Sequence, residues 1–89
     1  MAAHMTLEPL ADRPAWDVRV DGQRVGVVFR ERRDFRGVQE GSSSPLPGRF
    51  TTREAAARAL ARRGGFEELD PHIVEVGARR GEGPPRRSG

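Results

Sequence analysis

Apolar and polar residues alternate most clearly in the stretch WDVRVDGQRVGVVFR, residues 16–30. A period of two is typical of half-buried β-strands. The dipeptide Asp21-Gly22 divides the stretch and favours a two-residue hairpin turn, because both positions of a type I′ turn need a positive φ. The turn and the alternation together predict three cross-strand pairs: Val20 with Gln23, Val18 with Val25, and Trp16 with Val27.

This register predicts which side chains share a face of the sheet. The core face carries five apolar residues: Trp16, Val18, Val25, Val27 and Phe29. The exposed face carries the remaining positions: Arg19, Arg24, Gly26, Val28 and Arg30. On that exposed face, Val28 forms a shallow apolar strip among the arginines.

A third strand is predicted over residues 35–40, FRGVQE, after a turn at residues 31–34. If Arg30 pairs with Phe35, then Val27 pairs with Val38 and Val28 with Gly37, but the sequence leaves this register open by one residue. A shift of one residue would turn every side chain of the strand to the other face. Residues 41–48, GSSSPLPG, are predicted to form a loop, because two prolines exclude a central strand.

The stretch RFTTREAAARALARRGG, residues 49–65, predicts a helix. Thr51 and Glu54 have the spacing of a capping box, in which each side chain accepts the other residue's backbone N–H. Helix propensity is high through the alanines, and Gly64-Gly65 provides a C-cap. One stripe of the helix is expected to pack on the sheet: Ala56, Ala59, Leu60 and the stem of Arg63.

Three regions follow from these patterns. Residues 1–15 are polar and contain two prolines, so we expect a flexible arm, with a cloning remnant at 1–4 and a natural start at Met5. Residues 16–76 are predicted to form one α+β domain, a three-stranded antiparallel sheet packed on one C-terminal helix (βββα). Residues 72–76 alternate in polarity, as either a short fourth strand or an extended segment would. Residues 77–89 are rich in Arg, Gly and Pro and are expected to be disordered.

The charge of the chain is uneven along its length. Its 16 cationic side chains are all arginine, and they stand against 13 carboxylates in 89 residues. Residues 1–15 carry a net −1, residues 16–76 a net +1 and residues 77–89 a net +3. The basic character therefore comes from the tail, which lowers the weight of overall charge as evidence of nucleic-acid binding.

The sequence offers no group typical of catalysis or of metal binding. It has no cysteine, which excludes disulfides and thiolate metal sites and fits a reducing cytoplasm. His72 has no second histidine or cysteine beside it. No apolar run reaches the roughly 20 residues of a membrane span. We therefore expect a cytoplasmic, non-enzymatic protein with no cofactor, metal, membrane or small-molecule ligand.

The order of the predicted elements and two short motifs resemble a known class of DNA-binding domain. The third strand contains FRGV, and the helix entry resembles a Gly-x-Phe-x-Thr-x-x-Glu-Ala pattern, matched at Gly48, Phe50, Thr52 and Ala55–Ala56 with Glu54 one place early. This pattern is similar to that of the three-stranded domains at the N-terminus of phage and transposon integrases, whose architecture plant AP2-type domains share. The resemblance covers residues 16–63. It implies that the exposed sheet face lies in the DNA major groove while the helix supports the sheet from behind.

The leading hypothesis is a small DNA-binding or nucleoprotein accessory protein of bacterial or phage type, with double-stranded DNA as its partner. Arginine suits both phosphate contacts and bidentate contacts to guanine. The candidate contacts are Arg19, Arg24, Arg30 and Arg36 on the sheet, and Arg79 and Arg80 in the tail.

Two other interpretations stay open. Carboxylates near these arginines could neutralise them and leave a solvated sheet face: Asp17, Asp21, Glu31 and Asp34. Alternatively, the Val28 strip or an edge strand could join the chain to a protein partner or a second copy, without nucleic acid. The helix arginines are interpreted as a solubilising face: Arg53, Arg58, Arg62 and Arg63.

Overall fold

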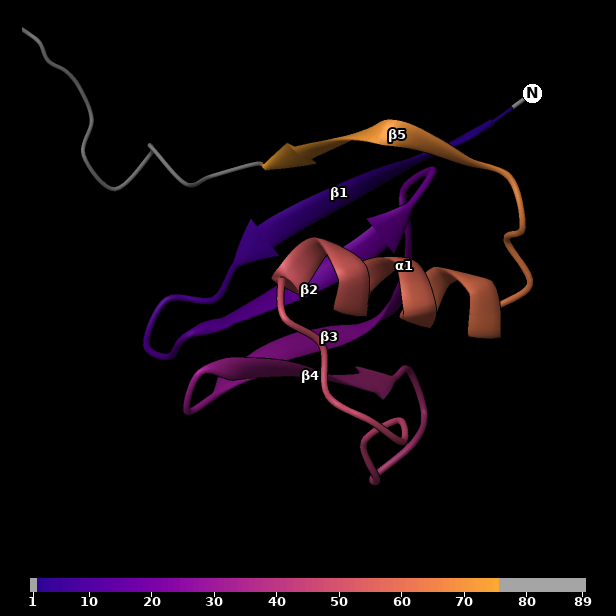
Figure 1. Ribbon diagram of the computed structural model, residues 1–89. Helices are drawn as coiled ribbons and strands as arrows, with labels where there is room; N and C mark the ends of the chain where they lie inside the picture. Colours follow the sequence, from indigo (N-terminus) through magenta and orange to yellow (C-terminus); the bar gives the residue numbers. More distant parts are fainter. Residues whose placement is uncertain (1, 76–89) are drawn as a thin grey trace, which may run out of the picture.

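The computed structural model describes residues 2–75, which form one sheet with a helix packed against it (Figure 1). The elements follow in the order β1 (Ala3–Pro9), β2 (Ala15–Val20), β3 (Gln23–Glu31), β4 (Asp34–Gln39), α1 (Arg53–Arg63) and β5 (Leu69–Glu75). Across the sheet the strands lie in the order β4-β3-β2-β1-β5. Neighbouring strands are antiparallel except β1 and β5, which are parallel.

The predicted three-stranded antiparallel sheet with a C-terminal helix is therefore wrong. The sheet has five strands and is mixed, and the helix lies in the middle of the chain. The three expected strands are present as β2, β3 and β4. Beyond β2 the sheet gains β1 and β5, one strand from before and one from after the predicted meander. The connection through α1 carries the chain from β4 across the sheet to β5 (Figure 1).

The strand β1 replaces the flexible arm that the sequence predicted for residues 1–15. It lies inside the sheet, between β2 and β5. Met5 and Leu7 are fully buried and lie opposite Val20 and Val18 of β2. In the sequence, the alternation of Met5 and Leu7 alone is too short to predict a strand. Here the neighbours on both sides satisfy the backbone and cover the side chains.

The β2–β3 hairpin begins as predicted. Asp21 and Gly22 have φ values of 51° and 85°, so both lie in the left-handed region that a type I′ turn requires. Val20 lies opposite Gln23, as the turn predicts.

One step further, a β-bulge changes the register. Arg19 lies opposite Arg24, but Val18 lies opposite Gly26, so Val25 is an extra residue in β3. Val25 and Gly26 are both buried. The bulge lets two successive residues of β3 face the helix side of the sheet.

Beyond the bulge, each β3 side chain lies on the face opposite to the predicted one. Val28 lies opposite Trp16 and is fully buried, so the exposed strip predicted at Val28 is wrong. Val27 and Phe29 were expected in the core, but neither packs against it. The cause is the exact period of two in a strand, through which one added residue exchanges the faces.

Leu60 of α1 packs where two glycines meet on the helix side of the sheet. A Cβ built on Gly37 would lie 3.0 Å from Cγ of Leu60, and one built on Gly26 would lie 3.1 Å from both of its Cδ atoms. A Cβ built on Gly26 would also lie 2.3 Å from the carbonyl oxygen of Val38, so the backbone of β4 leaves no room for a side chain at this position. The glycines of β3 and β4 therefore set how closely the helix approaches the sheet.

The β3–β4 register, which the sequence left open by one residue, pairs Arg30 with Phe35, Val27 with Val38, and Val28 with Gly37. The outer edge of β4 is covered by the chain that leads to the helix. The amide of Leu46 donates to the carbonyl of Gly37 at 2.7 Å. Phe50 and Phe35 exchange two backbone hydrogen bonds of 2.8 and 2.9 Å.

The edge at β5 is interrupted at its middle. Pro71 has no N–H, and its carbonyl accepts a hydrogen bond of 2.6 Å from Nη2 of Arg58. Nη1 of the same guanidinium donates to the carbonyl of Asp70 at 3.3 Å. Both edges of the sheet are thus poor templates for pairing with another strand.

Helix α1 begins one residue later than the capping box predicts. The N-cap is Thr52, whose Oγ1 accepts the amide of Ala55 at 3.1 Å, in place of Thr51 paired with Glu54. The C-cap is Gly64, as predicted, and its amide donates to the carbonyls of Leu60 and Ala61. The buried residues of the helix are Ala56, Ala57, Leu60 and Ala61.

Trp16 lies on the helix side and packs against the core, as the sequence predicts. Its ring centroid is 5.9 Å from that of Phe35. The guanidinium of Arg53 lies 5.0 Å from the Trp16 centroid and pairs with the carboxylate of Glu75. One arginine at the start of the helix therefore contacts β2 and β5 together, by a cation–π contact and an ion pair.

Candidate functional site

The face of the sheet opposite α1, here called the outer face, carries no helix within residues 2–75 (Figure 1). Because residues directly opposite one another share a face, the pairing assigns its side chains in three rows. The first row holds Ala15, Phe29 and Arg36; the second holds Glu8, Asp17, Val27 and Val38; the third holds Val74, Thr6, Arg19 and Arg24.

Three of these side chains form an apolar patch on β3 and β4, here called the outer patch: Val27, Phe29 and Val38. Val27 and Val38 are direct cross-strand partners, and Phe29 is two residues from Val27 on the same face. All three are half-buried and none packs against the core. They cover one another, but no element of the described chain covers them.

The arginines of the outer face are neutralised by nearby carboxylates. Arg19 pairs with Glu8, with 3.8 Å between Nε and Oε1. Arg24 bridges two acids, Asp17 at 3.1 Å and Glu40 at 3.4 Å. The side chains of Arg19 and Arg24 are only 40% and 44% exposed, so each is held against the sheet.

Arg36 is the most enclosed of these arginines. Its side chain is 23% exposed, and Nη1 lies 3.4 Å from Oε1 of Glu31. Nη2 donates to the carbonyl of Leu46 at 3.3 Å. Arg36 therefore ties the loop before the helix to β4, and little of it faces solvent.

The remaining candidate arginines lie elsewhere. Arg30 lies opposite Phe35 on the helix side, because the bulge exchanged the faces of β3, and its Nε donates to the carbonyl of Arg32 at 3.1 Å. The structure therefore does not bring Arg30 together with Arg19 and Arg24 as the sequence predicted. Arg79 and Arg80 lie outside the described residues.

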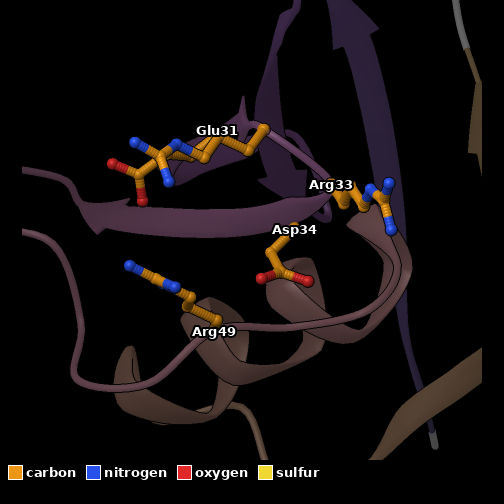
Figure 2. Close-up of a pocket in the computed structure, with 5 residues that line it drawn as sticks. Glu31, Arg33, Asp34 and Arg49 are labelled. Carbon is orange, nitrogen blue, oxygen red and sulfur yellow. The ribbon is translucent and has the colours of Figure 1, made fainter.

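A second group of arginines surrounds the β3–β4 turn. Arg32, Arg33 and Arg49 are exposed and line a hollow of about 360 Å³ together with Glu31 and Asp34. Within residues 2–75, none of the three forms an ion pair. In the view of Figure 2, Arg49 extends to the same side as the Glu31 carboxylate, whereas Arg33 extends to the opposite side. The Arg33 and Arg49 guanidiniums therefore do not converge on one point.

Comparisons with protein-family models, with curated proteins and with solved structures each found no match. Within the described chain, α1 is neither long nor apolar enough to cross a membrane. In the same residues, no three His, Asp or Glu side chains gather where they could hold a metal ion.

Sequence reasoning missed the outer patch because it assumed unbroken alternation along β3. One signal was available: an isolated glycine in a strand often marks a bulge or a close approach of another element. Gly26 marks both here. The arginines at residues 32, 33 and 49 were missed for another reason, since turn and loop positions give no periodic pattern.

Proposed function

We propose that this protein is a small interaction domain that uses the outer face of its sheet to bind a second copy of itself. The observation that carries the proposal is the outer patch, three adjoining apolar side chains on a face that no element of residues 2–75 covers. Such a patch, rimmed by polar groups, is typical of protein contact surfaces.

The charges of the outer face also favour this proposal. Three arginines on it form ion pairs with four carboxylates: Arg19, Arg24 and Arg36 with Glu8, Asp17, Glu31 and Glu40. A two-fold interface joins the same surface of both subunits, so a surface of mixed sign can be complementary to itself. A surface of mixed sign also gives little net attraction to a phosphate backbone.

Both edges of the sheet disfavour the alternative of edge-strand pairing. The β4 edge is hydrogen-bonded to residues 46 and 50. The β5 edge contains Pro71, whose carbonyl is occupied by Arg58. The face, not the edge, is therefore the surface left for association.

Sedimentation velocity of the full chain over a wide range of concentrations tests the proposal. We expect the mean mass to rise from monomer to dimer as the concentration increases. The Phe29→Thr and Val38→Thr variants remove apolar contact and keep strand propensity, so they should remain folded and monomeric. Association through an apolar patch should also persist at high salt.

Val74→Thr is the matched control. Among residues 2–75, Val74 is the large apolar residue that is exposed, at 55%. It lies opposite Thr6 on the outer face, but at the β5 edge, three strands away from β3 and the outer patch. This variant should associate like the original chain. A chain that stays monomeric at every concentration contradicts the proposal, as does equal weakening by all three substitutions.

A second candidate function, nucleic-acid binding, is favoured by the β3–β4 end rather than by the sheet face. Arg32, Arg33 and Arg49 have no carboxylate partner in the described chain and line one hollow, where Arg33 and Arg49 extend to opposite sides (Figure 2). An extended polyanion suits such a spread better than a single anion does. We infer that any contact with double-stranded DNA uses these arginines, together with Arg79 and Arg80.

Fluorescence anisotropy with a random DNA duplex at two salt concentrations separates the two candidates. If DNA binds, we expect the affinity to fall steeply with salt, and the Arg32→Ala/Arg33→Ala variant to flatten this dependence. Arg19→Ala should change little, since Glu8 neutralises Arg19. If no DNA binds at low salt, nucleic-acid binding is excluded, whereas the proposal of self-association is unaffected.

A further inference from the structure

A groove on the helix side of the molecule has the composition of a binding site for a small organic anion. It lies between α1 and the loop before it, with a volume of about 370 Å³. Leu46, Pro47, Phe50 and Ala59 form its apolar lining, and Arg62 and Arg63 complete it. Among residues 2–75, no carboxylate lines this groove.

The loop wall of the groove is fixed in place by β4. The amide of Leu46 donates to the carbonyl of Gly37 at 2.7 Å, and Leu46 itself is only 7% exposed. The backbone of Phe50 is held by two hydrogen bonds to Phe35. The apolar lining on this side therefore exists before any ligand binds, which lowers the entropic cost of binding.

The helix wall supplies both the space and the charge. Ala59 has a small side chain, which leaves the groove open, and Arg62 and Arg63 follow it by three and four positions on the same helix face. Both arginines are exposed, and neither forms an ion pair within residues 2–75. The last turn is held by Gln39, whose side chain donates to the carbonyl of Arg63 at 3.4 Å.

We propose that this groove binds a small carboxylate with a compact apolar body, such as a single aromatic ring on a short chain. The apolar lining takes the body, and the Arg62 and Arg63 guanidiniums take the carboxylate through charge-assisted hydrogen bonds. A volume of about 370 Å³ lies near the lower end of ligand pockets, which matches a ligand of this size. The sequence predicted no small-molecule ligand, because the loop and the helix face meet only in the folded chain.

The proposal is tested by titrating the ¹⁵N-labelled full chain with 3-phenylpropionate and following the backbone amide resonances. We expect saturable shifts at Phe50, Ala59, Arg62 and Arg63. The neutral 3-phenylpropanamide should bind about tenfold more weakly, the factor expected for one charge-assisted hydrogen bond. Acetate, which has the charge but no apolar body, should give no saturable shifts in the groove.

Variants locate the site. Arg62→Ala/Arg63→Ala should weaken 3-phenylpropionate binding about tenfold or more, and Ala59→Leu should block it by filling the groove. Arg33→Ala removes an exposed arginine at another site and should leave binding unchanged. The amide spectrum itself reports whether each variant is folded. Three results would overturn the proposal: no saturable shift, equal affinity for the propanamide, or binding that the double arginine variant retains.

Discussion

At the scale of single residues, the contact between Leu60 and the two sheet glycines determines how the layers pack. Leu60 is fully buried, and the positions of Gly26 and Gly37 leave no room for a Cβ at ordinary contact distance. Neither glycine has a positive φ, so steric fit rather than backbone conformation requires glycine here. An alanine at either position would push against the helix.

We expect Gly37→Ala to lower the free energy of unfolding by about 1–3 kcal/mol, the usual cost of overpacking. Leu60→Ala alone should cost about 2–5 kcal/mol through the lost apolar contact and the cavity. Because the added methyl enters the space that the leucine leaves, the double variant should cost less than the sum of the two. Urea denaturation of the four proteins in this cycle measures the coupling, and strict additivity would contradict the contact.

At the scale of elements, the sequence predicted helix α1 in the correct region but placed its N-cap one residue too early. Thr51 and Thr52 are adjacent, and the capping-box spacing to Glu54 favours Thr51. In the structure Thr52 is the N-cap, and Glu54 pairs with Arg53. The backbone bonds that hold Phe50 to Phe35 leave two residues before the helix and so set where it begins.

The two threonines provide a direct test. Thr52→Ala removes the acceptor for the amide of Ala55, so it should lower the free energy of unfolding by about 1 kcal/mol. Thr51→Ala is the matched control and should change stability by less than about 0.5 kcal/mol, as is usual for an exposed site. Thermal denaturation followed by circular dichroism compares them. The reverse order would restore the capping box predicted from the sequence.

At the scale of the whole molecule, β1 joins the two parts of the sheet. It lies between the β2–β3–β4 meander and β5, and it provides Met5 and Leu7 to the core. β5 has no other strand partner in the described chain. Its connection to the rest of the sheet therefore depends on β1, with help from Arg53 and Arg58 of the helix.

Leu7→Ala should therefore lower the free energy of unfolding by about 2–5 kcal/mol, as for a fully buried leucine. Thr6→Ala, one residue away on the outer face, is the control and should cost far less. A chain beginning at residue 10 should lose its cooperative thermal transition, because β2 and β5 would both lose the strand that lies between them and the core would lose Met5 and Leu7. Full stability of that shorter chain would support the flexible arm predicted from the sequence.

The sequence by itself determined the features that depend on neighbouring residues. The type I′ turn at residues 21–22 and the end of α1 at Gly64 follow from local φ preferences and capping. The tertiary structure alone decided the bulge at Val25, the strand β1 and the parallel pairing of β1 with β5. These features are stabilised by residues distant in the chain, and their local patterns are short or broken. Because one extra residue in β3 exchanges its faces, the surfaces that bind partners could be assigned only after the strands, the helix and their glycine contacts were placed together.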